Sequence, residues 1–353
     1  MDFRFDEDQE MLQATVREFL QGEVTPEAVR ALWETDTGRS PELWKQLAEI
    51  GVPGLLVPEE HGGMGLCEEE MVLLIEEAGR AALAEPVIST AAIAVPLLNQ
   101  IGGSLASEWL PKIAAGEAIA AVGHPVSPFV EDAHVADLLL LPDHGGALHA
   151  VTRDAAEVQI QPANDPSRRI ASVEFEASAE TRIADGDEAS RLFAATLDRG
   201  ALACAAGALG VCDRLIRLAA EYASERKQFG KPIGSFQAVK HMLANVKVKL
   251  EYARPLVQRA AHSVAHHAAA RDVHVSMAKL AACEAATLGA KTALQAHGAI
   301  GYTWEQDLHL WMRRAWSLDH AWGRSSFHLG RVREALFAGA LPIGPGTTFS
   351  GDA

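Results

Sequence analysis

Residues 224–241 of the chain read Ser-Glu-Arg-Lys-Gln-Phe-Gly-Lys-Pro-Ile-Gly-Ser-Phe-Gln-Ala-Val-Lys-His. This stretch separates two long segments, about 189–224 and 236–257, in which apolar residues recur at three- and four-residue steps. That spacing predicts two helices. Gly230, Pro232 and Gly234 interrupt the pattern, because glycine accepts positive φ and proline has no amide to donate. We expect Ser235 to cap the second helix.

The loop between the two helices combines positive charge, an aromatic ring and side-chain amides. These groups belong to Arg226, Lys227, Lys231, Phe229, Gln228 and Gln237. Cations beside a flat ring and a helix N-terminus suit a ligand that carries phosphates and planar rings. An ordinary helix–helix turn with basic side chains is the simpler alternative, and the residues alone favour it.

The sequence from Glu225 to His241 resembles the signature of the acyl-CoA dehydrogenase family. In that family the arginine binds the pyrophosphate of FAD, often across a subunit interface. The aromatic residue and the first glutamine lie against the adenosine half, and the later glutamine also contacts the cofactor. The resemblance gives these roles to Arg226, Phe229, Gln228 and Gln237.

A second segment resembles the family's other FAD-contacting stretch, which is supplied to the neighbouring subunit. Consecutive amides in such a glycine-rich turn can form an anion site, although a Gly-x-x-Gly turn is more often only a helix cap. The family has glycine where this chain has Ala299, whose amide stays available if its φ is negative. The residues that the resemblance assigns to FAD are Gln295, Ala296, His297, Gly298, Ala299 and Gly301.

The rest of the chain predicts a mostly α protein of the acyl-CoA dehydrogenase type. Short apolar or alternating runs at 138–141, 147–151, 157–160 and 170–175 indicate strands, and helical periodicity lies on both sides of them. We expect an N-terminal helical domain over 1–117, a reduced middle β-domain over 118–186, a C-terminal four-helix bundle over 187–345 and a tail over 346–353. Asp6 and Gln9 predict a cap before the first helix, and 142–146 predicts a hairpin turn. Segments 44–65 and 76–80 also resemble the family's N-terminal helices. The segment 304–314, which we expect to begin the last long helix, resembles relatives from sterol and ring-compound degradation.

The middle region departs from the family pattern. The family's β-domain holds the flavin ring and begins with a Thr-Glu-Pro and a Gly-Ser-Asp segment. The corresponding stretch 123–128 reads Gly-His-Pro-Val-Ser-Pro, which contains neither. The region is also shorter than usual, which argues against independent flavin binding by this chain.

The catalytic base is a second departure. An acyl-CoA dehydrogenase removes the proton α to the thioester carbonyl while hydride leaves the β-carbon for flavin, so a carboxylate near the α-carbon is required. Most family members place a glutamate after the last helix. When 313–315 is aligned with that helix, Trp322 stands in its place and Arg324 replaces the adjacent threonine.

A minority of the family places the glutamate in the first bundle helix, directly before an arginine. The matching pair here is Asp198 and Arg199. Asp198 is therefore the candidate base, although its side chain is one methylene shorter. The alternative is that Asp198 is an acid in the first turn of a helix, stabilised by the helix dipole.

Composition excludes several classes of function. The 353-residue chain has a formal net charge of −16, which disfavours non-specific nucleic-acid binding. Its four cysteines contain no CxxC pair, as expected of reduced cytosolic thiols. We expect no metal site, because the neighbouring His266 and His267 would point about 100° apart on a helix. The N-terminus lacks a signal-peptide pattern and no apolar run is of membrane-spanning length, so we expect a cytoplasmic protein without a membrane partner.

Three functions remain open. The chain is an active flavoenzyme with Asp198 as base in a homo-oligomer, a catalytically defective subunit beside a related acyl-CoA dehydrogenase chain, or a flavin-free CoA-ester-binding or scaffold protein. The missing flavin-ring elements and glutamate favour the second function, and the retained FAD segments argue against the third. We expect a component of an FAD-dependent acyl-CoA dehydrogenase that takes an acyl-CoA substrate and forms a homo- or hetero-oligomer, a dimer of dimers.

Overall fold

The computed structural model of the chain describes residues 3–339. These residues belong to two compact units that alternate along the sequence. The first unit comprises Met1–Pro26, Val72–Leu83 and Cys204–Ala353, and the second comprises Glu27–Met71 and Ala84–Ala203. Helices α4 (Glu68–Ala81) and α7 (Gly186–Glu225) begin in the second unit and continue into the first. The tail expected at 346–353 lies outside the described residues.

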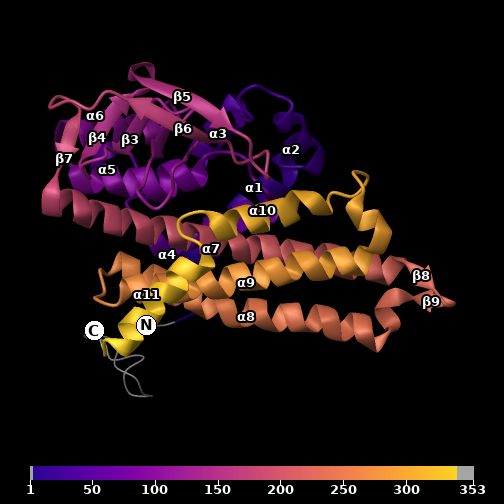
Figure 1. Cartoon of the computed structure of the whole chain (residues 1–353). Coiled ribbons are helices and arrows are strands. Elements are labelled where there is room, and N and C mark those ends of the chain that lie inside the picture. The colour runs from indigo at the N-terminus through magenta and orange to yellow at the C-terminus, as the bar shows by residue number, and fades with distance from the viewer. Residues whose placement is uncertain (1–2, 340–353) are drawn as a thin grey trace. The chain divides into compact units, whose positions relative to one another are not determined.

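The first unit is built from helices (Figure 1). Besides its parts of α4 and α7 it contains α1 (Glu7–Glu23), α8 (Gln237–Ala265), α9 (Arg271–His297), α10 (Leu308–His320), α11 (Ser325–Phe337), the strands β8 (Lys227–Gln228) and β9 (Lys231–Pro232), and 3-10 turns at Ile233–Ser235 and Gly298–Tyr302. The long helices α8 and α9 lie side by side, and α10 and α11 pack against α9. The hairpin β8–β9 joins α7 to α8.

The second unit combines short helices with two small sheets. Its helices are α2 (Pro26–Trp33), α3 (Pro41–Glu49), a π-helix at Val87–Ala94, α5 (Val95–Ile101), α6 (Gly103–Ala114), and 3-10 turns at Glu59–His61 and Arg153–Ala155. Its strands are β1 (Ala120–Val122), β2 (Val130–Glu131), β3 (Leu138–Pro142), β4 (Leu148–Thr152), β5 (Ala156–Gln161), β6 (Ile170–Phe175) and β7 (Arg182–Ala184).

The strands form two sheets around one apolar core. One sheet has the order β1-β3-β4-β7, in which β1 and β3 are parallel and the other pairs antiparallel. The other has the antiparallel order β2-β6-β5. Buried residues from both sheets, among them Ala121, Leu139, Val151, Val130 and Ala171, make up the core.

The predicted mostly α fold class with a small β-region is confirmed. All four predicted strands form, and Pro142–Gly146 does connect an antiparallel hairpin. Asp6 and Gln9 form a reciprocal capping box at the start of α1, and Pro41 lies in the first turn of α3 behind the Ser40 cap. Helices end at Ala114 and resume at Gly186, while the domain boundaries at 117 and 186 stay a prediction.

Two local predictions were wrong. Ser235 does not cap α8, because its hydroxyl donates to the Pro232 carbonyl at 2.7 Å and Phe236 occupies the cap position. The helix expected to begin at Trp304 and to be the last is instead two helices, α10 and α11, separated by a turn in which Gly323 has φ +94°. A residue with positive φ does not continue an α-helix, so the turn at 321–324 separates α10 from α11.

The first unit contains a close crossing of α4 and α7 at glycine residues. A Cβ at Gly210 would overlap the Glu76 carbonyl oxygen and lie 2.7 Å from the Arg80 amide nitrogen, and a Cβ at Gly79 would overlap the Gly207 carbonyl. The two backbones therefore touch, and only glycine leaves room for this approach.

Charged side chains surround the crossing and are largely buried. The Arg80 guanidinium donates to Glu77 at 2.9 Å and to Glu76 at 2.9 Å, and it pairs with Asp213. Arg254 of α8 donates to both oxygens of Glu76 at 2.8 Å. Arg17 of α1 donates to both oxygens of Glu77 at 2.7 and 3.1 Å. A buried charge of this kind requires its partners, so these pairs fix α1, α4, α7 and α8 in one register.

We expect Gly210→Ala to destabilise the protein by roughly 2–3 kcal/mol, because its methyl group forces α4 and α7 apart. Gly330 of α11 is the matched control, since a Cβ there meets nothing within 4 Å, and Gly330→Ala should stabilise by about 0.5–1 kcal/mol. Urea unfolding followed by circular dichroism measures both. A Gly210→Ala variant as stable as the wild type would contradict the close crossing.

A separate buried ionic cluster lies in the second unit. Arg39 pairs with Asp132 and also donates to the Ser167 carbonyl at 2.8 Å. Glu85, which is 5% exposed, accepts from the Ser40 amide at 2.9 Å through one oxygen. Its other oxygen has no partner among the described residues. Burial raises the pKa of Glu85 to about 7, against the lowering effect of the Ser40 amide and of Arg39.

The raised pKa of Glu85 makes stability depend on pH. The folded carboxyl binds its proton more tightly than the unfolded one. The free-energy cost of ionising the buried Glu85 is therefore absent below about pH 4.5 and complete above about pH 7. Glu85→Gln should therefore be more stable than the wild type by on the order of 3 kcal/mol at pH 8, and equal to it near pH 4.5. Denaturant titrations at both pH values test this. A difference that does not change with pH would refute it.

Candidate functional site

The loop singled out in the sequence forms a tight hairpin. Gln228 pairs with Lys231, which leaves Phe229 and Gly230 as a two-residue turn with φ values of +55° and +79°. Two consecutive positive φ values are those of a type I′ turn, which glycine tolerates. For Phe229 this backbone costs on the order of 1–2 kcal/mol, yet its ring is 91% exposed. A strained and exposed aromatic residue at a loop tip indicates a functional contact.

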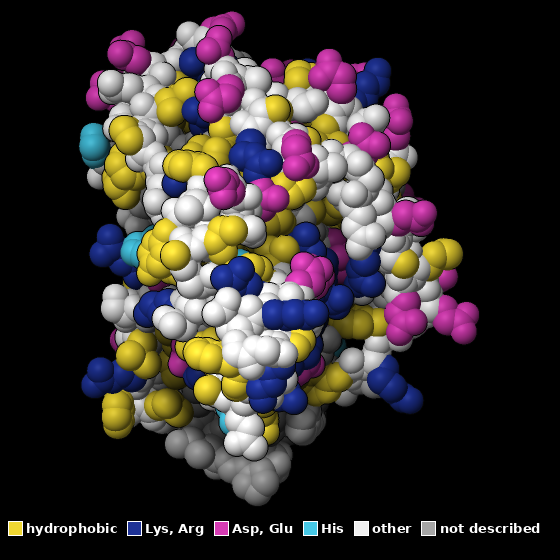
Figure 2. Space-filling view, turned by 90° about the vertical axis from the view of Figure 1, so that its right-hand side faces the viewer, with side chains coloured by type: hydrophobic (Ala, Val, Ile, Leu, Met, Phe, Trp, Pro, Cys, Tyr) yellow, Lys and Arg dark blue, Asp and Glu magenta, His cyan; other side chains and the backbone are white. Residues whose placement is uncertain are grey.

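The cations of this hairpin are available to an anion. Figure 2 shows the face from which the hairpin projects, with Lys and Arg side chains gathered across its middle. Arg226, Lys227 and Lys231 are exposed. None of them forms an ion pair with a carboxylate in residues 3–339, and the Lys231 ammonium lies 4.4 Å from the centre of the Phe236 ring. The site residues Gln228 and Gln237 are also exposed, and Gln237 is the first residue of α8.

The second predicted segment lies at the end of α9 and is tied to the first. The Tyr222 ring stacks on His297 with centroids 4.4 Å apart and planes 20° apart. His297 Nδ1 is 2.8 Å from the Ala293 carbonyl oxygen, so the imidazole is held at the helix end. Because Arg226 follows Tyr222 by one helical turn, this stack positions the two segments relative to each other.

The individual residues of this second segment differ in exposure. Gly298 ends α9 with φ +64°, and Ala299 keeps a negative φ, as its role requires. Gln295, Gly298 and Ala299 are exposed, whereas Ala296, His297 and Gly301 are buried. Their assignment to FAD stays a prediction, and the exposed members are those that can reach a ligand.

These two segments fit the anionic half of FAD better than its ring. Unpaired cations, a projecting aromatic ring and a glycine turn suit a pyrophosphate and an adenosine group. The stretch 123–128, where the family holds the flavin ring, is instead a closed turn. The Val126 amide donates to His124 Nδ1 at 3.0 Å, and Nε2 donates to the Phe193 carbonyl at 3.0 Å. Ser127 bonds to Phe129, so this turn uses its polar side chains internally.

Asp198 is 2% exposed and lies well inside α7, whose first-turn acids are Asp187 and Glu188. The alternative that Asp198 is a first-turn acid is therefore wrong, because the helix begins earlier than that alternative requires. Arg199 donates to Glu68 at 2.7 Å. When the Gln100 side-chain amide is turned so that its oxygen faces Arg199, that oxygen accepts a hydrogen bond from the Arg199 guanidinium at 2.9 Å.

Trp322, which the family resemblance places where most members have the glutamate, is held in a fixed turn. Its φ is +56°, and its carbonyl oxygen is 2.9 Å from Nε2 of the fully buried His328. Burial lowers the pKa of His328 to about 4, so the imidazole is neutral at pH 7. Its Nδ1 lies 3.1 Å from the Ser276 hydroxyl. The indole of Trp322 accepts no proton, so this position supplies no base.

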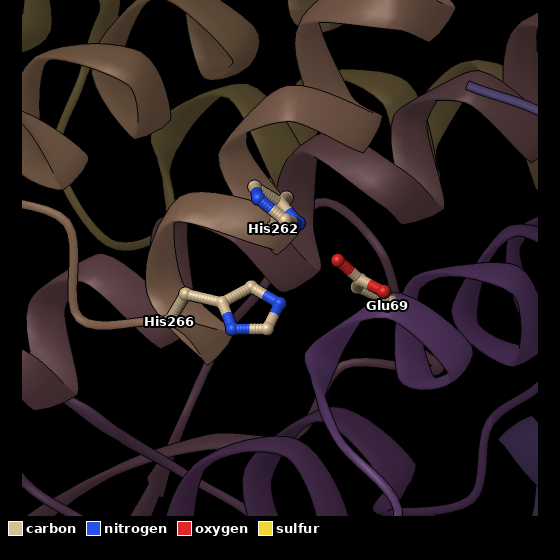
Figure 3. Close-up of side chains that lie close together, drawn as sticks. All are labelled: Glu69, His262 and His266. Atoms are coloured by element: carbon tan, nitrogen blue, oxygen red, sulfur yellow. The ribbon is translucent and has the colours of Figure 1, made fainter. Parts of the chain in front are cut away.

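The sequence did not lead us to expect a close pair of histidines. His262 lies in the last turn of α8 and His266 is the C-cap residue of that helix, with ring centroids 4.2 Å apart (Figure 3). Glu69, also labelled there, belongs to the second unit. Imidazoles at i and i+4 share a helix face and can bind one transition metal ion together. The four-residue spacing of His262 and His266 could have predicted this pair, whereas only the adjacent His266 and His267 were considered from the sequence.

Comparison with known proteins agrees with this architecture. The family profiles for the N-terminal and C-terminal domains of acyl-CoA dehydrogenase match residues 6–117 and 190–337. Acyl-CoA dehydrogenase IpdE2 of Mycobacterium tuberculosis is 34% identical over 311 residues, 88% of this chain and 91% of its own. Among the described helices, none is both long and apolar enough to cross a membrane.

Two solved structures share the fold closely. The Tcur3481–Tcur3483 steroid ACAD variant has a TM-score of 0.85 and 25% identity over 95% of this chain and 99% of its own. The ChsE4–ChsE5 complex of Mycobacterium tuberculosis has a TM-score of 0.84 and 26% identity over 98% of this chain and 100% of its own. The fold and the family matches thus define an FAD-dependent oxidoreductase. The chain belongs to the acyl-CoA dehydrogenase family.

We expect Arg226→Ala to abolish FAD retention in the assembled oligomer, because alanine cannot replace a charge-assisted, bidentate contact with phosphate. Arg333→Ala is the control, since Arg333 is an exposed arginine of α11 outside both segments. The flavin absorbance per protein after gel filtration is the measurement. Full flavin retention by Arg226→Ala would show that the pyrophosphate binds elsewhere.

Proposed function

We propose that this chain is the non-catalytic partner in a heteromeric acyl-CoA dehydrogenase. The complex removes hydrogen from the α and β carbons of an acyl-CoA thioester, and flavin accepts the hydride from the β-carbon. The observation that carries the proposal is the turn at 321–324. By resemblance Trp322 stands at the base position, and the buried His328 lies 2.9 Å from its carbonyl oxygen.

The residues that this chain retains indicate which part of the FAD site it supplies and which part its partner supplies. Its hairpin keeps Arg226 without an acidic partner among residues 3–339 and holds the strained, exposed Phe229 ready for a contact outside the chain. The closed turn at 123–128 satisfies its side chains internally instead of offering them to a flavin ring. This chain therefore binds the ADP half of FAD, while the partner supplies the ring site and the carboxylate that takes the α-proton.

Similarity to known complexes supports a heteromer. The ChsE4–ChsE5 structure contains two different chains, and the Tcur3481–Tcur3483 protein is described as a steroid ACAD. By analogy we infer a dimer of dimers with a related chain and an acyl group attached to a steroid or another ring compound. We also infer the domain division at 117, 186 and 345, of which the boundaries at 117 and 186 parallel the changes in secondary structure.

A self-sufficient homo-oligomer is the second candidate function, and Asp198 favours it. This carboxylate is buried and directly precedes Arg199, in the order that a minority of the family uses for its base. Aspartate is shorter than glutamate, and a misplacement of about 1 Å can reduce a rate ~100-fold. We therefore place the base on the partner.

The decisive variant is Asp198→Asn in the assembled complex, since the amide keeps the shape but cannot accept the α-proton. We expect the greater part of the dehydrogenation rate to remain, as in the control Asp187→Asn from the exposed first turn of α7. Rates with an artificial electron acceptor measure both. Loss of more than about 99% of the rate, ~2.7 kcal/mol of transition-state stabilisation, would make this chain itself the catalyst.

A further inference from the structure

A cleft of about 460 Å³ lies within the first unit, between α1, α4, α7 and α10. Its walls combine arginines with apolar side chains, and its volume falls in the range of small-molecule sites, roughly 300–1,000 Å³. The members that matter here are Arg17, Leu20, Val24, Arg80, Arg214 and Trp311. None of them belongs to the two FAD segments or to the candidate base, so the cleft has no role in the proposed function.

Three of the four arginines that line the cleft already have carboxylate partners. Arg17 binds Glu77, and Arg80 binds Glu76, Glu77 and Asp213. The third of them, Arg217 of α7, donates to Asp213 at 2.7 Å. The guanidinium groups of these three residues belong to the charge network at the α4–α7 crossing and are not free to bind a ligand.

Arg214 is different. Its guanidinium carbon lies 5.2 Å from the centre of the Trp311 ring, and it makes no ion pair or hydrogen bond with any residue that the structure describes. The side chain is only partly exposed. A partly buried guanidinium stacked on an indole keeps its edge N–H donors, which form a planar fork that matches a carboxylate.

Trp311 is a rigid platform for this arginine. It is 3% exposed, and its indole N–H donates to the Arg80 carbonyl at 2.8 Å. The ring is therefore locked to the end of α4. The indole and the aliphatic side chains of Leu20 and Val24 on α1 provide apolar wall beside the charged group.

The charge of the cleft limits its ligand to a single negative charge. Arg214 is the one lining cation without a carboxylate among the described residues, and two acids, Glu77 and Glu221, also line the cleft. Glu77 is committed to Arg17 and Arg80, while Glu221 is exposed to water, which screens its charge. A phosphate dianion would meet these carboxylates with only one cation to balance it.

We propose that this cleft is a binding site for an amphipathic monocarboxylate. The carboxylate accepts two hydrogen bonds from the Arg214 guanidinium, and the apolar part lies against Leu20, Val24 and the Trp311 ring. The ligand is held without a covalent step.

Binding of hexanoate to the full-length protein in its native assembly tests the site by saturation-transfer NMR titration. Hexanamide is the neutral isostere, and inorganic phosphate is the anion without an apolar part. We expect saturable binding of hexanoate, at least tenfold weaker binding of hexanamide and of phosphate, and at least tenfold weaker hexanoate binding by Arg214→Gln. Arg217→Gln, which removes a paired arginine of the same cleft, should bind hexanoate within about twofold of the wild type.

Arg214→Lys separates recognition from folding, because it keeps the charge and the aliphatic stem but lacks the planar fork. It should retain the thermal unfolding midpoint of the wild type and weaken hexanoate binding severalfold. The proposal is overturned if the wild type shows no saturable binding, if Arg214→Gln binds hexanoate as well as the wild type does, or if hexanamide or phosphate binds as tightly as hexanoate.

Discussion

The first unit depends on the contact between the backbones of α4 and α7, which glycines make possible. Around this contact the buried carboxylates of α4 and α7 gather arginines from other helices. The same end of α4 is also tied to α10, because Trp311 donates to the Arg80 carbonyl and Arg314 donates to the Leu83 carbonyl, each at 2.8 Å. Carbonyl groups at the end of a helix have no partner within it, so these bonds satisfy groups that would otherwise be buried and unpaired. A single crossing thus places α1, α8 and α10.

The ligand-facing segments are attached to this scaffold at its ends. α7 leads directly into the hairpin that carries Arg226 and Phe229, and the Tyr222–His297 stack fixes the end of α9 beside it. Rigid helices hold a strained turn in position, and strain of this kind persists only where the surrounding structure supports it. The proposed cofactor segments are therefore held by ordered helices, whereas the turns at 123–128 and 321–324 are closed by hydrogen bonds of their own.

Much of the fold was predictable, because helices, long strands and caps depend on local patterns. The boundaries of α7, the hairpin β3–β4 and the cap at Asp6 followed from periodicity and turn residues. The strands β1, β2 and β7 have only two or three residues, too few to show a period. The ionic network at the α4–α7 crossing joins residues far apart in sequence, so no local pattern could show it. The cleft at Arg214 was missed for the same reason, while the motif at 225–241 was visible because its residues are contiguous.

In the proposed function, this chain completes a flavin site that it cannot form alone. The direct measurement is the flavin absorption band, together with acyl-CoA dehydrogenation, of the purified chain alone and after co-expression with a related acyl-CoA dehydrogenase chain encoded nearby. The account predicts a colourless, inactive chain by itself and a yellow, active complex with the partner. A chain that is yellow and turns over an acyl-CoA by itself would contradict the account.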